Sequence, residues 1–251
     1  MSSRKPLDYR EEIIRRRLTL VDKALVVTGG KGGVGKSLVA SVAAVLLSKS
    51  HETGLLDLDL HGPSCSYILG VEETPIEGPD GLIPPKVDGL KVMSLDLLVK
   101  GLPVPLSGGA KEEVVKEVLA LTDFGKLDYL VVDLPPGSGD ELLAVCRYLR
   151  GKGSALVVTT PTSLSIRFAF RVIKLLQSVS FPVLGVVENM SSGTVSELCE
   201  AACRELGVKT LGSLPFDPVF ATPGRSSLEE ILGSDLASKL ESILDREIVK
   251  L

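Results

Sequence analysis

The 251-residue sequence lacks any long apolar segment, and its charge is nearly balanced. No run approaches the ~18 consecutive apolar residues of a transmembrane helix, and residues 1–22 hold no apolar core of a secretory signal. We therefore expect a cytoplasmic protein with no stable membrane insertion. The net charge of −4 gives no reason to expect nucleic-acid binding, which usually needs a strongly basic surface.

Cysteine, histidine and side-chain amides are also scarce. Four cysteines at uneven positions do not form a disulfide framework in a reducing compartment. The two histidines, His51 and His61, lack the spacing of a metal-binding pair. Asn189 and Gln177 are the only amide side chains, and depletion of thermolabile amides marks many heat-adapted proteins. We expect a thermophilic source, and the surviving Asn189 becomes a candidate for a specific role.

The chain is rich in apolar residues and in glycine, at 44% hydrophobic with 25 Gly and 15 Pro. Short apolar runs alternate with helical patterns, which predicts an α/β fold with a mainly parallel sheet covered by helices on both faces. The segment 72–89, rich in Pro, Gly and acidic residues, is expected to be an irregular surface excursion. The expected strands are 24–28, 55–58, 90–94, 129–133, 155–159 and 183–187, and the expected helices are 36–49, 111–121, 140–150, 164–178 and 195–206.

We divide the chain into an N-terminal helical extension, residues 1–23, and one domain, residues 24–251. The extension mixes basic and acidic residues with a few apolar ones, so it either packs on the domain or contacts a partner or a membrane surface. Residues 235–251 form an amphipathic pattern whose polar side is not basic, as a membrane-targeting helix would require. We expect that helix to pack on the domain.

The strongest motif is a glycine-rich loop between an expected strand and an expected helix. It fits G-x-x-x-x-G-K-[ST], the phosphate-binding P-loop, in which backbone N–H groups surround phosphate oxygens at a helix N-terminus. Lys36 is expected to reach the β- and γ-phosphates of ATP, and the Ser37 hydroxyl to bind Mg²⁺. The expected ATP-binding residues of this segment are Gly30, Lys31, Gly32, Gly33, Val34, Gly35, Lys36, Ser37 and Leu38.

A second lysine, Lys31, lies inside the same loop. A cation there can point away from its own nucleotide and neutralise transition-state charge in a second subunit, as an arginine finger does. The alternative is a solvent-exposed loop lysine without a catalytic role.

Carboxylates follow two of the expected strands. Asp57 and Asp59 come at the end of strand 55–58, and alternation places them on the same side. We expect Asp59 to position the attacking water and Asp57 to support Mg²⁺ or the adjoining loop; the alternative is two acids that cap a turn. Asp133 ends an apolar strand in the manner of a Walker B acid, which holds Mg²⁺.

These motifs carry a resemblance. The loop Gly30–Ser37 resembles the deviant Walker A box of the MinD, ParA, Mrp and nitrogenase iron-protein superfamily of P-loop ATPases. The segments Asp57–Ser64, Leu127–Asp140 and Gly185–Ser191 are similar to the Mrp/ApbC-type iron–sulfur carrier branch. The resemblance covers residues 20–220 and implies a P-loop NTPase fold, ATP with Mg²⁺, and a homodimer that meets through its nucleotide face.

The resemblance also implies roles for individual residues. It implies that Lys31 is the signature lysine that crosses the dimer interface. It implies that Asn189 recognises the adenine edge, for which an amide offers both a donor and an acceptor. Pro215 and Asp217 lie where this superfamily closes the base pocket.

The sequence departs from the branch at its cysteines. Mrp-type carriers place Cys-x-x-Cys shortly after the segment that matches Glu188–Ser191, but this chain has no Cys-x-x-Cys. Cys199 and Cys203 lie four residues apart, on one face of an expected helix. They either pack in the core as small apolar residues or, in pairs across a dimer axis, hold a [4Fe–4S] cluster. An intrahelical disulfide has poor geometry.

Two functions follow from these observations. The first is a slowly hydrolysing dimeric ATPase that carries or assembles iron–sulfur clusters, with assembly or recipient proteins as partners. The alternative is a nucleotide switch of the MinD or ParA kind, with no metal cargo.

Overall fold

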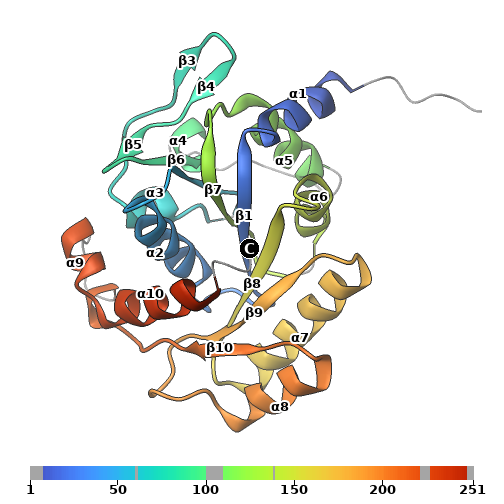
Figure 1. Ribbon diagram of the computed structural model, residues 1–251, viewed down its shortest axis with the longest axis vertical. Helices are drawn as coiled ribbons and strands as arrows, with labels where there is room; N and C mark the ends of the chain where they lie inside the picture. Colours follow the sequence, from blue (N-terminus) through green and yellow to red (C-terminus); the bar gives the residue numbers. More distant parts are fainter. Residues whose placement is uncertain (1–7, 60–61, 100–109, 138, 221–226, 248–251) are drawn as a thin grey trace, which may run out of the picture.

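The computed structural model describes residues 8–59, 62–99, 110–137, 139–220 and 227–247. Over these residues one eight-stranded sheet runs through the molecule in the order β10-β9-β8-β1-β7-β2-β6-β5, parallel except for the last pair (Figure 1). Its strands are β1 Val21–Thr28, β2 Thr53–Asp57, β5 Lys86–Val87, β6 Leu90–Ser94, β7 Leu127–Asp133, β8 Gly153–Thr159, β9 Val183–Glu188 and β10 Thr210–Ser213.

Helices cover both faces of this sheet, as the alternation of patterns predicts (Figure 1). Successive residues of β1 point to opposite faces, so Ala24 and Val26 join one apolar core while Leu25 and Val27 join the other. One face carries α2 Lys36–Ser48, α3 Cys65–Ile68, α9 Leu228–Leu232 and α10 Asp235–Glu247. The other face carries α1 Tyr9–Leu18, α5 Ala110–Leu121, α6 Asp140–Tyr148, α7 Ser163–Ser178 and α8 Glu197–Leu206.

The first helix is part of this core. Asp8 caps α1 by accepting the backbone N–H of Arg10, and Ile14 is completely buried among the residues of the α5–α6 side. The Arg10 guanidinium also lies 2.6 Å from the Glu113 carboxylate of α5. Strand β1 begins at Val21, so the expected boundary between residues 23 and 24 falls inside a strand, while residues 1–7 lie outside the described part.

The segment 72–89, expected to be irregular, contains regular structure. Strands β3 Ile76–Gly78 and β4 Gly81–Ile83 form an antiparallel hairpin, and β5 pairs with β6. The prediction of irregular structure was wrong because these strands are short and because glycine is found in hairpin turns as well as in irregular loops. Gly81, at the hairpin turn, has φ +144. Arg17 of α1 donates to the Asp80 carbonyl at the hairpin turn.

The C-terminal helix packs as predicted. Leu236, Leu240 and Leu244 of α10 are buried against the face that carries α2, while residues 248–251 lie outside the described part. Among the described residues, no helix is both long and apolar enough to cross a membrane. Short elements complete the chain: α4 Leu95–Val99 and the 3₁₀ turn Pro218–Phe220.

Candidate nucleotide and magnesium site

The phosphate loop occupies the turn from β1 into α2, at the carboxyl edge of the sheet where α/β proteins bind ligands. Gly33 and Gly35 adopt positive φ angles of +77 and +86, which a side chain would strain. Gly35 is the N-cap of α2, so the helix begins at Lys36 with its N–H groups facing the loop. The sequence prediction of a strand–loop–helix unit is confirmed.

The loop is closely packed on two sides. The N–H of Gly137, after β7, donates to the Gly29 carbonyl at 2.9 Å. A Cβ atom at Gly30 would overlap the backbone of Phe168 in α7, so this position requires glycine. The loop is therefore held between α7 and the segment that follows the Walker B strand.

The two lysines of the loop differ in exposure. Lys36 is buried, at 5% exposure, in the first turn of α2, whereas Lys31 is exposed at the start of the loop. Ser37 and Leu38 are half-buried in the same turn. Lys36 and Ser37 are therefore at least partly enclosed at the start of α2, whereas Lys31 is accessible to another molecule.

Asp57 and Asp133 end neighbouring strands and are register partners across β2 and β7. Both carboxyl groups are fully buried. Asp57 accepts hydrogen bonds from four donors: the N–H groups of Asp59 (3.1 Å), Ser64 (2.9 Å) and Cys65 (3.0 Å), and the Ser94 hydroxyl (3.1 Å). Asp57 thus organises the loop after β2 and the start of α3.

Asp133 is less well satisfied. Its Oδ1 has no hydrogen-bond partner within the described part of the chain. Burial raises the pKa of Asp133 to about 8, and the negative charge of Asp57 adds to the rise, while Ser37 and Lys36 oppose it. Burial raises the pKa of Asp57 as well, against its hydrogen-bond donors. A cation beside Ser37 and Asp133 would relieve this repulsion, so these residues fit Mg²⁺.

Asp59 is separated from Asp57 by the end of the strand. Because β2 stops at Asp57, the alternation that would have placed both acids on one side does not continue. Asp59 is half-buried, and its Oδ1 accepts the N–H of Gly62 at 3.3 Å. The two acids therefore have distinct positions: Asp57 lies inside the sheet edge and Asp59 lies in the loop.

The segments expected to form the base pocket are neighbours. The N–H of Leu214, at the end of β10, donates to the Glu188 carbonyl of β9 at 2.9 Å. Asn189 is buried and its Nδ2 donates to the Val34 carbonyl of the phosphate loop at 2.9 Å. Asp217 accepts the N–H groups of Val219 (3.1 Å) and Leu236 (3.4 Å). Pro215 is half-buried beside them.

Cys199 and Cys203 lie in the core rather than on the surface. Both are free thiols, at 2% and 4% exposure, in the apolar cluster between α7 and α8. The pKa of the Cys199 thiol is raised chiefly by its hydrogen bond with Cys203 and next by burial. The burial agrees with the packing alternative, and ligation of a cluster across a dimer axis would require α8 to move.

The comparison with protein families identifies the family of the chain. A family model described as the NUBPL iron-transfer P-loop NTPase of the ParA group matches residues 20–246. The chain belongs to this family. Its deviant Walker A loop, its parallel sheet and its Walker B strand are accordingly those of a P-loop NTPase, and membership supports nucleotide hydrolysis as the general activity.

Relatives of this chain are named as iron–sulfur cluster proteins. An iron–sulfur cluster carrier protein of Methanocaldococcus jannaschii is 36% identical, covering 86% of this chain and 80% of that protein. The cytosolic Fe-S cluster assembly factor CFD1 of Eremothecium gossypii is 36% identical, covering 88% and 89%. The chain's homologues are therefore iron–sulfur carrier and assembly factors of the P-loop NTPase family.

Solved structures share the fold. A nucleotide-binding protein from Archaeoglobus fulgidus in complex with ADP has a TM-score of 0.69 and 28% identity, covering 92% of each chain. The septum site-determining protein MinD of Pyrococcus horikoshii, in complex with Mg-ADP, has a TM-score of 0.66 over 89% of this chain and 95% of that chain. At 22% identity the second likeness concerns the fold alone.

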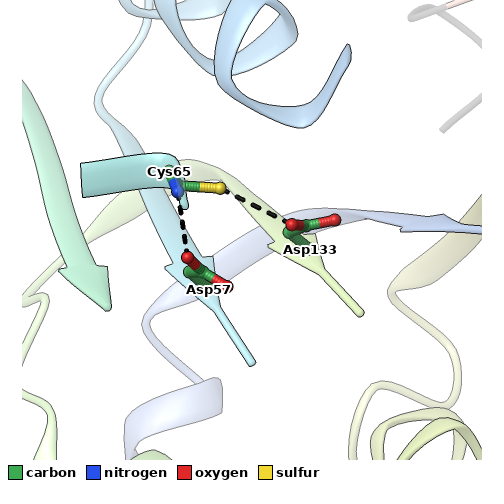
Figure 2. A group of neighbouring side chains, drawn as sticks. All are labelled: Asp57, Cys65 and Asp133. Atoms are coloured by element: carbon green, nitrogen blue, oxygen red, sulfur yellow. Dashed lines mark hydrogen bonds between the residues drawn. The ribbon is translucent and has the colours of Figure 1, made fainter. Parts of the chain in front are cut away.

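Sequence reasoning missed two side chains at the site of this family member. Ser94, at the end of β6, donates to Asp57. The Cys65 Sγ lies 3.6 Å from Asp133 Oδ2, and Figure 2 shows this contact. Cys65 is buried, and its position beside Asp133 was not predicted from the sequence. A polar residue ending the strand next to β2 was the available signal for Ser94.

Proposed function

We propose that this protein is a cytoplasmic, homodimeric ATPase that carries or helps to assemble iron–sulfur clusters. The observation that carries the proposal is the convergence of Lys36, Ser37, Asp57 and Asp133 at one edge of the sheet, in a chain of the iron-transfer P-loop family. Assembly or recipient proteins would be its partners, as the names of its relatives suggest. Nucleic acid is not an expected partner.

In this proposal, ATP is hydrolysed by direct attack of water on the γ-phosphate. Lys36 and the loop N–H groups would stabilise the phosphate charge, Ser37 and Asp133 would hold Mg²⁺, and Asp59 would position the water. Asp57 keeps the loop that carries Asp59 in place through its hydrogen bonds. Asn189, Pro215 and Asp217 border the adenine.

The exposure of the Lys31 side chain supports the proposal that the protein is a dimer. A loop cation that leaves its own nucleotide needs a second phosphate group, and a partner chain facing the same edge would supply one. Hydrolysis is then slow in the monomer and depends on dimer formation. ATP binding would set the dimer geometry in which cargo is held or released.

The second candidate function is a nucleotide switch without metal cargo. One observation favours it: all four cysteines, Cys65, Cys146, Cys199 and Cys203, are buried in the single chain. A bridging [4Fe–4S] cluster needs thiolates from both subunits, and none is at the surface.

Anaerobic iron–sulfur reconstitution separates the two candidates. The carrier proposal predicts a visible chromophore with about four irons per dimer, the content of one [4Fe–4S] cluster. It also predicts that the Cys199→Ser/Cys203→Ser variant loses this chromophore, while Cys146→Ser, a substitution of another buried thiol, retains it. A colourless wild-type protein that still binds ATP would contradict the carrier proposal and support the switch.

A further inference from the structure

The Cys65 thiol joins the two buried carboxylates of the nucleotide site in one cluster (Figure 2). One ligand atom of each of Asp57, Cys65 and Asp133 lies within 4.8 Å of the others, and all three residues are fully buried. They come from β2, from the first residue of α3 and from β7. Three elements thus bring two oxygen donors and one sulfur donor to the same place.

Packing alone does not account for this cluster. The Cys65 thiol is within hydrogen-bonding distance of two oxygen atoms as a donor, with Sγ 3.6 Å from Asp133 Oδ2 and 3.8 Å from the Ser37 carbonyl. Asp133 is fully buried, and its Oδ1 has no hydrogen-bond partner in the described chain. Buried carboxylate oxygens without a partner are rare and point to a missing ligand.

The spacing suits a small metal ion. With metal–sulfur bonds of about 2.3 Å and metal–oxygen bonds of about 2.0 Å, sulfur and oxygen ligands of a tetrahedral ion lie about 3.5 Å apart. The separation between Cys65 Sγ and Asp133 Oδ2 is 3.6 Å. Three protein ligands leave one position for water or substrate, as in open metal sites.

We propose that Asp57, Cys65 and Asp133 bind a divalent transition-metal ion of the Zn²⁺ and Co²⁺ class in the nucleotide-free protein. A thiolate favours such ions over Mg²⁺, which takes oxygen ligands. When the metal–sulfur bond forms, the Cys65 thiol releases its proton to solvent, and the ion takes its place beside the carboxylates. No electron is transferred in this step.

The site has a consequence for nucleotide binding, which rests on the proposed function. Asp133 is the acid expected to hold Mg²⁺, so the same carboxylate cannot serve both ions without rearrangement. The transition-metal ion would therefore compete with Mg²⁺–ATP, and metal occupancy would regulate the ATPase. Binding of the ion to the nucleotide-free protein does not depend on that role of Asp133.

Cobalt titration tests the site directly. Metal-free protein without nucleotide is titrated with Co²⁺, and the thiolate-to-cobalt charge-transfer absorption is recorded. We expect one cobalt per chain with this absorption, its loss on addition of Zn²⁺, and no loss with an equal concentration of Mg²⁺, because the thiolate favours the transition metal. Cys65→Ser should abolish the absorption, while Cys146→Ser and Cys199→Ser/Cys203→Ser, which alter the other buried thiols, should keep it.

The same titrations have outcomes that would overturn the proposal. No charge-transfer absorption in the wild type, or an absorption that persists in Cys65→Ser, would overturn the proposal and leave Cys65 as a packing residue. If Cys65→Ser is unfolded by circular dichroism, Asp133→Asn takes its place, because it keeps the thiol and removes one carboxylate. A folded Asp133→Asn that binds Co²⁺ as tightly as the wild type would equally overturn the site. Failure of ATP hydrolysis alone would leave this result unchanged, since no nucleotide is present.

Discussion

Asp57 and Asp133 face each other across β2 and β7 as register partners, and both carboxyl groups are fully buried. Asp57 is surrounded by hydrogen-bond donors, whereas one oxygen of Asp133 has none in the described chain. Two negative charges buried side by side repel each other. Without a cation, the pair is therefore more stable when one of its carboxyl groups is protonated. The pair is therefore a place where a cation would be stabilised.

The Asp133 pKa predicts a pH-dependent stability of the cation-free protein. Its folded-state pKa is about 8 against an ordinary value of 3.8, so the folded chain binds more protons than the unfolded chain in that interval. The free energy of unfolding should therefore fall as pH rises from about 4 to about 8, and level off above it. Asp133→Asn, which mimics the protonated form, should flatten the slope in urea unfolding.

An exposed acid provides the control for that measurement. Asp140, in the first turn of α6, is exposed, so Asp140→Asn should keep the wild-type slope. A slope that is unchanged in Asp133→Asn would contradict the electrostatic account of the pair. Added Mg²⁺ should reduce the slope in the wild type only, because the ion replaces the proton.

The burial of α1 predicts that the N-terminal helix stabilises the whole domain. Ile14→Ala removes a fully buried side chain, and it should lower the free energy of unfolding by about 2–5 kcal/mol. Its neighbour Ile13 is 37% exposed, so Ile13→Ala should change stability by no more than about 0.5 kcal/mol. Equal small effects in urea unfolding would show that α1 is only loosely attached.

The close approach of Asn189 to the phosphate loop predicts a difference between two glycines. A Cβ atom at Gly35 would overlap the Asn189 amide, whereas one at Gly33 would meet nothing within 4 Å. Both residues have positive φ, so backbone strain is common to both substitutions. Gly35→Ala should weaken ATP binding about tenfold more than Gly33→Ala, a difference of about 1.4 kcal/mol. Equal affinities in calorimetric titration would contradict the packing of Asn189 on the loop.

The sequence was sufficient for features that depend on local pattern. Strand 90–94 was predicted with its observed bounds, and the Walker B strand ends at Asp133 as expected. The buried parallel strands are continuous apolar runs, which a local reading detects. The family resemblance is confirmed by the match over residues 20–246.

Features that depend on contacts between residues distant in the sequence could not be predicted from local patterns. The Cys65 thiol reaches Asp133 only because the first residue of α3 lies beside the carboxyl ends of β2 and β7. The β3–β4 hairpin is a pair of three-residue strands whose partner is set by register, not by composition. The different positions of Asp57 and Asp59 follow from the residue at which β2 stops.

The action of Lys31 across a dimer is the central claim about mechanism, and a mixing experiment tests it. Lys31→Ala should bind ATP but hydrolyse it about 10²–10³-fold more slowly, the effect of losing one group that stabilises the transition state. Asp59→Asn should also hydrolyse ATP much more slowly than the wild type, while it retains Lys31. Mixed dimers of the two variants contain one site with an intact Asp59 and a lysine from the partner, so the mixture should hydrolyse ATP faster than the sum of its components. A mixture no more active than that sum, or a Lys31→Ala variant with the wild-type rate, would contradict the account.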